Sequence, residues 1–282
     1  MTIQRVGIVG SGTMGNGIAQ AFAANGIDVA LTDIAEAALQ KALQTIAGSY
    51  DRLIKKEKAT AEQKAAALAR ITTSTDLSSI ADCDLIIEAA TENEALKLKI
   101  FKQIDETAKP DAIIASNTSS ISITKLAAAT GRPDKVIGMH FFNPVPMMAL
   151  VETIRGLQTS DATQATTEAV ARQIGKTPVK VRNSPGFVVN RVLVPMINEA
   201  IFMLSEGLAS AAEIDEAMKL GANHPMGPLA LGDLIGLDVT LAIMQVLYAG
   251  FNDPKYRPAP LLIEMVEAGY LGRKSGRGFF TY

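Results

Sequence analysis

The chain has 282 residues, enough for two domains or one large α/β domain. Its hydrophobic content of 48%, charged content of 20% and formal net charge of −2 describe a globular protein with no electrostatic basis for binding nucleic acid or an anionic membrane. No apolar run reaches the roughly 20 residues of a membrane-spanning helix, no signal-peptide pattern is present, and the one cysteine, Cys83, excludes an internal disulfide, so we expect a cytoplasmic protein.

The first predicted elements are a strand, a glycine-rich turn and a helix. An apolar run at 6–9 precedes Gly10, Gly12 and Gly15, which have the spacing G-x-G-x-x-G, and an apolar helix follows that ends near 25–26. In dinucleotide-binding folds these glycines permit a tight turn, approach of the pyrophosphate to the backbone, and close packing of helix on strand. The helix N-terminus adds N–H groups and the positive end of its dipole. The motif alone also occurs in ordinary turns, but its setting here predicts a dinucleotide site.

Asp33 follows the second predicted strand, 28–32, and bears on the choice of dinucleotide. A carboxylate at this point binds the hydroxyls of the adenosine ribose and repels a 2′-phosphate. Ile34 and Ala35, which come next, supply no arginine to pair with such a phosphate. The sequence therefore favours NAD over NADP, with an N-cap role for Asp33 as the lesser alternative.

The remaining elements of the first two-thirds alternate between helix and strand. Residues 35–69 are rich in helix formers and predict two helices broken near 58–60, where Thr60 can cap the second, as a helical hairpin inserted into the sheet domain. Further strands are predicted at 71–73, 85–88, 112–116, 136–141, 148–155 and 177–181, with helices such as 94–108 and 162–174 between them. This alternation predicts an α/β fold with a Rossmann-type, doubly wound and mostly parallel sheet.

A composition break at 183–186 (Asn-Ser-Pro-Gly) divides the chain. We expect an NAD-binding domain at 1–184 and an all-α domain at 185–282, with helices at roughly 187–206, 210–219, 228–249 and 259–268. The first of these helices is strongly apolar and contains Pro195. Because about a hundred residues form only a small core, the surplus apolar surface predicts a homodimer through this domain.

His140 ends the predicted strand 136–141, at the sheet edge where doubly wound folds bind their ligands. The strands on either side of the turn 144–146 are expected to form a hairpin, and symmetric pairing places Glu152 opposite His140. A carboxylate bound to one imidazole nitrogen fixes the tautomer and raises the basicity of the other nitrogen, as a general base requires. From geometry alone, a structural histidine beside a solvent-facing glutamate is an equal alternative.

Two further polar features belong to the same argument. Residues 116–120 (Ser-Asn-Thr-Ser-Ser) follow the strand 112–116, and their side chains can bind the nicotinamide ribose, polarise a substrate oxygen or cap the next helix. Asn190 lies in the apolar stripe of the first C-terminal helix, where a polar side chain needs a partner or a cleft. On the residues alone, an amide bonded to nearby backbone is the favoured interpretation of Asn190.

The whole chain resembles the short-chain L-3-hydroxyacyl-CoA dehydrogenases, a family that includes bacterial enzymes acting on 3-hydroxybutyryl-CoA. The motifs that carry the resemblance lie in both predicted domains. They are G-S-G-T-M-G at 10–15, S-N-T-S-S at 116–120, H-F-F-N-P-V-P at 140–146, Glu152, S-P-G-F-V-V-N-R at 184–191, P-M-G-P-L at 225–229 and G-R-K-S-G-R-G-F-F at 272–280.

The resemblance implies roles for particular residues. It implies an active site of Ser119, His140, Glu152 and Asn190, in which Ser119 and Asn190 also contact the substrate. The implied cofactor contacts are Gly10, Gly12, Thr13, Met14, Gly15, Asp33, Glu92, Lys97, Asn117, Asn143 and Lys274. Ser49 and Lys56 match positions that touch coenzyme A, although 52–58 otherwise has the pattern of a solvated helix face. The resemblance implies no metal, and dimers that form through the helical domain.

The expected activity is NAD-dependent, reversible hydride transfer between (S)-3-hydroxybutyryl-CoA and acetoacetyl-CoA, or related short-chain acyl-CoA pairs. His140 is the expected general acid/base, oriented by Glu152. A dehydrogenase of free 3-hydroxy acids is an alternative, but such enzymes typically use a lysine on the interdomain helix, and 187–206 contains none. A non-catalytic NAD-binding protein, similar to the lens crystallins derived from this family, is a third hypothesis, which the complete set of four active-site residues disfavours.

Overall fold

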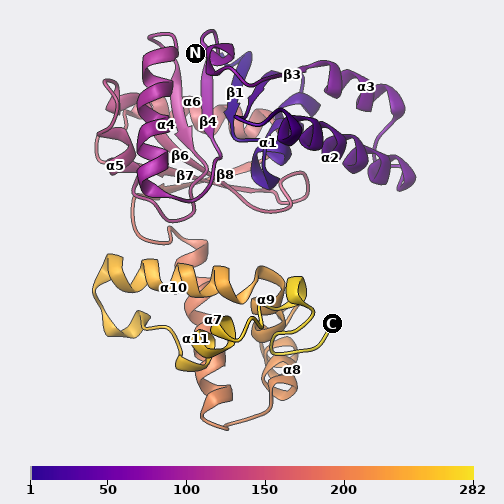
Figure 1. Ribbon diagram of the computed structural model, residues 1–282, viewed down its shortest axis with the longest axis vertical. Helices are drawn as coiled ribbons and strands as arrows, with labels where there is room; N and C mark the ends of the chain where they lie inside the picture. Colours follow the sequence, from indigo (N-terminus) through magenta and orange to yellow (C-terminus); the bar gives the residue numbers. More distant parts are fainter. Residues whose placement is uncertain (1) are drawn as a thin grey trace. The chain divides into compact units, whose positions relative to one another are not determined.

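The computed structural model describes residues 2–282, which divide into two compact units between Asn183 and Ser184 (Figure 1). The first unit contains one eight-stranded sheet in the order β3-β2-β1-β4-β5-β6-β7-β8. Neighbouring strands run parallel except for β6 and β7, which pair antiparallel. The strands are β1 (Arg5–Val9), β2 (Asp28–Thr32), β3 (Ile71–Ser74), β4 (Leu85–Glu88), β5 (Ile113–Ser116), β6 (Val136–Phe141), β7 (Leu150–Arg155) and β8 (Thr177–Arg182).

Helices cover both faces of this sheet, and Figure 1 shows α4 and α6 on opposite sides of it. Alternate strand residues, such as Val6 and Ile8, pack with α1 (Thr13–Ala24), α2 (Glu36–Lys55), α3 (Ala61–Ala69) and α6 (Asp161–Gln173). The opposite face contacts α4 (Glu94–Thr107) and α5 (Ile123–Ala127). Every residue of β4, β5 and β6 is buried, and such continuous burial is the pattern of strands covered on both sides. The predicted doubly wound, mostly parallel fold is confirmed.

The helical hairpin between β2 and β3 also has its predicted form. It consists of α2 and α3, and Thr60 begins α3 with a capping box, in which its hydroxyl accepts from the Gln63 N–H and the Gln63 side chain accepts from the Thr60 N–H. Arg52 and Lys55 lie in the last turn of α2, where positive charge interacts favourably with the helix dipole. The break near 58–60 therefore has a local cause in its capping residue.

The register brings the carboxyl ends of four parallel strands level with one another. Val9, the last residue of β1, pairs with Thr32 of β2 and with Glu88 of β4, and Glu88 pairs with Ser116 of β5. The segments that follow these strands therefore emerge at one sheet edge, which is where ligands bind in such folds. Cys83, at the opposite end of β4, is fully buried, and burial raises the pKa of its thiol to about 11.

The second unit is helical. Its helices are α7 (Val189–Ser205), α8 (Ala211–Ala222), α9 (Pro228–Ile235), α10 (Leu237–Phe251) and α11 (Pro260–Glu267). Their apolar faces form a core that includes Ile197, Ile201 and Leu262. The buried carboxylate of Asp233 accepts the backbone N–H groups of Phe279 and Phe280, at 3.0 Å each, and so ties the C-terminal segment to α9.

The prediction of one helix over 228–249 is wrong. The segment forms α9 and α10, which are bent by 98° at Gly236. Gly236 has a φ of 104°, a conformation that residues with a side chain rarely adopt. Apolar residues recur at short spacing on both sides of this glycine, so the pattern alone does not reveal the bend.

Within residues 2–282, no single helix is long and apolar enough to cross a membrane, and only the bent pair α9–α10 passes by length and composition. The same residues contain no group of three or more His, Cys, Asp or Glu side chains placed to hold a metal ion.

Candidate active site

The glycine loop between β1 and α1 has the geometry of a phosphate cradle. A side chain on Gly15 would put its Cβ 1.8 Å from the Gly10 carbonyl oxygen, so helix and strand approach each other closely there. A Cβ on Gly12 would meet no heavy atom within 4 Å, so the space beside this backbone is open. Gly12 is the N-cap of α1 and provides no side-chain cap. Thr13 and Met14 thus start a helix whose first N–H groups and dipole can face a pyrophosphate, and the loop fits NAD.

Asp33 lies beside this loop and is bonded to it. Its Oδ2 accepts both the backbone N–H and the hydroxyl of Ser11, each at 2.8 Å, and its Oδ1 accepts the Ala35 N–H at 3.2 Å. Burial raises the pKa of the Asp33 carboxyl, but these hydrogen bonds outweigh burial and hold the pKa below its usual value. Asp33 is therefore an ionised group at the end of β2. The bond to Ser11 was not predicted from the sequence.

His140 and Glu152 are directly opposite each other in the β6–β7 ladder, so the predicted register is confirmed. His140 Nδ1 and Glu152 Oε2 are 2.7 Å apart, and both side chains are buried. The neighbouring residues Met139 and Val151 belong to the main core cluster on one face of the sheet. By alternation, His140 and Glu152 face the other side, which α4 and α5 cover.

The run that follows β5 is organised around Glu92. Glu92 Oε1 accepts the hydroxyl of Thr118, the backbone N–H of Ser119 at 3.0 Å and the hydroxyl of Ser120 at 2.9 Å. The hydroxyl of Ser119 lies 3.5 Å from the same oxygen. Burial raises the pKa of Glu92, but the positive charge of Lys97 and these hydrogen bonds outweigh it and keep the pKa below its usual value. Glu92 therefore fixes the loop that presents Ser119.

Lys97 lies in a buried network beneath Glu92. Its Nζ donates to Glu88 Oε1 at 2.7 Å and to the Ala90 carbonyl at 3.1 Å, and lies 3.4 Å from Glu92 Oε2. Glu88 Oε2 accepts the Ser116 hydroxyl at 2.7 Å. Lys97 is 1% exposed, and its three acceptors occupy the ammonium group. In this structure Lys97 acts on the site through Glu92, and a direct contact with NAD stays a prediction.

Sequence reasoning missed Glu88 and Ser116. A signal was available in Glu88, because an acidic residue that ends an otherwise apolar buried strand needs a charged partner.

Asn117 and Asn143 lie at the same edge. The Asn117 side-chain oxygen accepts the Phe141 N–H at 2.9 Å, which joins the end of β5 to the end of β6. Asn143 is exposed and lines a hollow of about 450 Å³ together with Gly12, Thr13, Ser49 and Arg52. The structure thus brings Asn143 and the glycine loop together, and Ser49, the predicted coenzyme A contact, lines the same hollow. Lys56, the exposed C-cap of α2, does not line this hollow, whereas Arg52 does.

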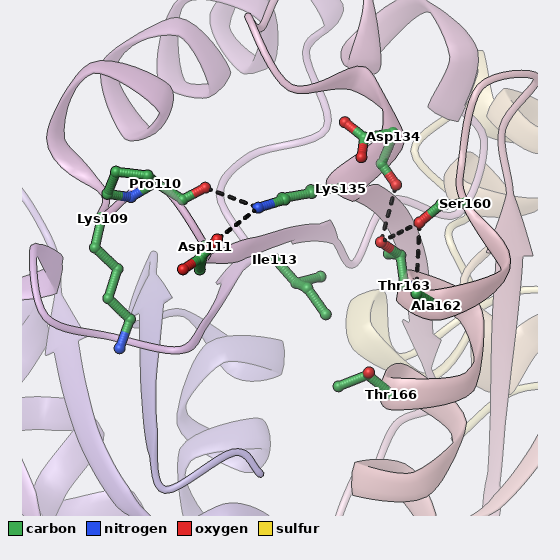
Figure 2. Close-up of a pocket in the computed structure, with 10 residues that line it drawn as sticks. All are labelled: Lys109, Pro110, Asp111, Ile113, Asp134, Lys135, Ser160, Ala162, Thr163 and Thr166. Carbon is green, nitrogen blue, oxygen red and sulfur yellow. Dashed lines mark hydrogen bonds and ion pairs between the residues drawn. The ribbon is translucent and has the colours of Figure 1, made fainter. Parts of the chain in front are cut away.

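A larger hollow of about 750 Å³ lies at the other edge of the sheet (Figure 2). Its residues precede or begin β5, precede β6, or lie at the N-cap or in the first half of α6, so the hollow is at the amino ends of the strands. Its polar side chains mostly bond one another: Lys135 Nζ lies 3.0 Å from both Asp111 Oδ1 and the Pro110 carbonyl (Figure 2). This hollow is therefore remote from the predicted chemistry despite its size.

The second unit carries two predicted site residues. Asn190 is half-buried in the first turn of α7, on the same side as Val194 and Ile197, which are buried. Lys274 forms an ion pair with Asp238 of α10, with 2.5 Å between Nζ and Oδ1. Their roles toward substrate and NAD stay predictions.

A doubly wound sheet with an open glycine loop and an ionised aspartate beside it defines a dinucleotide-binding protein. The family follows from the match of residues 5–184 to the 3-hydroxyacyl-CoA dehydrogenase NAD binding domain, and of residues 186–282 to the C-terminal domain of the same family. The chain belongs to the 3-hydroxyacyl-CoA dehydrogenase family, its cofactor is NAD, and the resemblance inferred from the motifs is confirmed.

Individual relatives agree with this assignment along the whole chain. It is 53% identical over 280 residues to a 3-hydroxybutyryl-CoA dehydrogenase of Bradyrhizobium diazoefficiens, covering 99% of this chain and 96% of the relative. It is 54% identical over 278 residues to the protein of that name from Clostridioides difficile, covering 99% of each. Among solved structures, the (S)-3-hydroxybutyryl-CoA dehydrogenase from Ralstonia eutropha is 66% identical with a TM-score of 0.97, covering 100% of this chain and 99% of that one.

Proposed function

We propose that the protein interconverts (S)-3-hydroxybutyryl-CoA and acetoacetyl-CoA with NAD as the hydride carrier. The observation that carries the proposal is the buried His140–Glu152 pair, at the same sheet edge as the open glycine loop, in a chain of this family. Relatives that match the chain end to end are named for 3-hydroxybutyryl-CoA, which supports the substrate.

His140 is the general acid/base of the proposed reaction. Its Nε2 takes the proton of the 3-hydroxyl group during oxidation and returns it to the ketone oxygen during reduction. Glu152 holds the other ring nitrogen, Nδ1, at 2.7 Å, so it fixes the tautomer and stabilises the imidazolium that forms. NAD held at the glycine loop would supply the hydride acceptor for oxidation at C3, and NADH the hydride donor for the reverse reaction.

Other residues bind and orient. Glu92 presents Ser119 for a hydrogen bond to the substrate oxygen, and we assign Asn190 a contact with the acyl thioester. Ser49 and Lys56 contact coenzyme A in this proposal. Cofactor contacts come from Gly10, Gly12, Thr13, Met14, Gly15, Asp33, Glu92, Lys97, Asn117, Asn143 and Lys274. We further infer a cytoplasmic homodimer that associates through the second unit and binds neither nucleic acid nor membranes.

The proposal is tested by following the decrease in NADH absorbance after acetoacetyl-CoA is added to the protein. We expect turnover with NADH, much weaker turnover with NADPH, and oxidation of the (S) but not the (R) isomer of 3-hydroxybutyryl-CoA in the reverse assay. Free acetoacetate should be a poor substrate. Turnover of free acetoacetate that equals turnover of the thioester would favour a free-acid dehydrogenase instead. A protein that binds NADH but turns over neither compound would be a non-catalytic member of the family.

A further inference from the structure

Lys176 is a buried cation with an unusual set of partners. It lies between α6 and β8, where Gly175 ends the helix in a left-handed conformation and the Lys176 N–H bonds back to the Ala171 carbonyl. The side chain is 8% exposed, and burial lowers the pKa of its ammonium group. Among the ion pairs of residues 2–282, none joins Lys176 to a carboxylate. A charge in such a place must be stabilised by other polar groups.

Those groups are two backbone carbonyls of one loop. Lys176 Nζ donates to the carbonyl of Val145 at 2.5 Å and to that of Met148 at 2.8 Å. Both acceptors lie in residues 143–148, which form the central part of the connection between β6 and β7. Charge-assisted hydrogen bonds of this kind are shorter and stronger than neutral ones. A single ammonium group thus fixes two points of the loop that follows the strand of His140.

The rest of this loop has few other attachments. Most of residues 143–148 are exposed, and Val145 alone among them is buried. Val145 packs against Gly17 of α1, where an added Cβ would come within 3.0 Å of it. The N–H groups of Met147 and Met148 both bond to the Pro144 carbonyl, which is within the loop itself. The loop is held on the sheet unit by the Val145 side chain, by the Lys176 ammonium and, just beyond Met148, by the Ala149 carbonyl, which accepts the Thr177 N–H at 2.7 Å.

The loop carries Asn143, which faces the hollow shared with the glycine loop. By contrast, His140 and Glu152 are held by the ladder of β6 and β7 and do not need the loop for their register. A displaced loop would therefore move Asn143 away from the cofactor but would leave the acid–base pair in place.

We propose that Lys176 is a positioning residue for cofactor binding, which holds the 143–148 loop, and with it Asn143, against the NAD site. This inference rests on the proposed function for the NAD-facing role of Asn143. It predicts a separation of kinetic effects, because the misplaced group binds the cofactor and does not transfer the proton.

The test compares Lys176→Met with Val170→Ala in the full-length protein. Val170 is buried in α6 and packs in the same core, so its truncation reduces thermal stability while both hydrogen bonds from Lys176 to the loop remain. We expect Lys176→Met to raise the KM for NADH by about tenfold to a hundredfold, the scale of a misplaced binding group, with kcat at saturating NADH changed by less than about threefold. Val170→Ala should leave the KM for NADH unchanged. Lys176→Gln keeps a shorter hydrogen-bond donor, so its KM for NADH should lie between those of wild type and Lys176→Met. If Lys176→Met does not fold, Lys176→Gln takes its place in the comparison with Val170→Ala.

A double-mutant cycle shows whether the effect passes through Asn143. Asn143→Ala should raise the KM for NADH, and adding Lys176→Met to it should then raise KM by less than about twofold, because the group being positioned is already gone. A KM for NADH in Lys176→Met no higher than in Val170→Ala, or effects of the two substitutions that multiply, would overturn the proposal.

Hydrogen exchange of the loop amides gives a readout independent of turnover. The amides of Val145, Met147 and Met148 should exchange faster in Lys176→Met than in wild type and Val170→Ala, whether or not acetoacetyl-CoA is a substrate. If wild type fails to reduce acetoacetyl-CoA, the proposed function fails alone. If the loop amides exchange at the wild-type rate in Lys176→Met, the positioning role fails.

Discussion

His140 and Glu152 are partners in the backbone ladder as well as in their side chains. The two residues pair across β6 and β7, and their side chains meet at 2.7 Å on the face that α4 and α5 cover. Because the sheet sets this separation, the carboxylate is in place before any ligand arrives. Such preorganisation is what a general base needs in order to keep one tautomer.

Glu152→Gln should leave the fold and NADH binding close to wild type and lower kcat strongly. The amide can stabilise the wrong tautomer and cannot support an imidazolium. His140→Ala should lower kcat by about 10² to 10⁴, the usual scale for a general acid/base. Steady-state kinetics with acetoacetyl-CoA, together with NADH fluorescence titration, measure both effects.

The double variant tests whether the two residues act as one unit. His140→Ala combined with Glu152→Gln should cost much less than the product of the two single effects. Effects that multiply would show that Glu152 has a separate role. A His140→Ala enzyme with near-wild-type kcat would contradict the assignment of the acid/base.

The sequence predicts the elements on which this pair depends, for physical reasons that are local. Short apolar runs bounded by turns define β1, β2, β4 and β6, and the symmetric spacing about 144–146 sets the register of His140. The buried contacts among polar groups were not predicted from the sequence. Ser11 meets Asp33 because β1 and β2 pair, and Lys97 meets Glu88 and Glu92 because α4 packs back on β4, so both contacts depend on how the elements pack.

Two further features, the bend at Gly236 and the hydrogen bonds of Lys176, could not be predicted from the sequence for a different reason. The bend at Gly236 depends on one positive φ within a largely apolar segment, and hydrophobic periodicity does not report backbone dihedral angles. The hydrogen bonds from Lys176 to the 143–148 loop are accepted by backbone carbonyls. Every residue has such a carbonyl, so no residue type in the sequence marks the acceptors.

Glu92 should make the protein's stability depend on pH in the acid range. Its folded-state pKa is below the usual value near 4.5, so its ionised form contributes stability above that value, and this contribution is lost as pH falls through the folded-state pKa. Glu92→Gln removes the titration. The stability difference between wild type and Glu92→Gln should therefore shrink on acidification from neutral pH to below pH 4.5. Thermal unfolding at several pH values measures this, and a difference that stays constant would contradict it.

Asp33 should determine the preference for NAD. Asp33→Ser combined with Ile34→Arg should weaken the use of NADH and improve that of NADPH, because a repelling charge is replaced by a pairing one. Ile34 is 98% exposed, so the arginine can be accommodated. Ile34→Arg alone is the control, since it keeps the bond between Asp33 and Ser11. An unchanged ratio of kcat/KM for the two cofactors in the double variant would place the ribose contact elsewhere.

Lys56 should contribute to coenzyme A binding through charge. Lys56→Ala is expected to raise the KM for acetoacetyl-CoA more than it lowers kcat, because a remote phosphate contact contributes equally to ground and transition states. The effect should diminish at high ionic strength. Lys58→Ala, two residues further on, removes a comparable exposed charge and should not change KM. If Lys56→Ala and Lys58→Ala have the same KM for acetoacetyl-CoA at low salt, Lys56 is part of a solvated helix end and does not bind coenzyme A.

Association should take place through the second unit. Large apolar side chains remain exposed there, with Val192 of α7 at 68% and Tyr248 of α10 at 46%. Apolar surface of this kind is stabilised when two copies cover it in an isologous contact. Light scattering should report a dimer at micromolar concentration. Val192→Asp or Tyr248→Asp should raise the monomer fraction, because a charge would then be buried against an apolar partner. Leu157→Asp, which changes an exposed leucine of the first unit, should not. A wild-type monomer at micromolar concentration would contradict the dimer, and dissociation by Leu157→Asp alone would place the interface on the sheet unit.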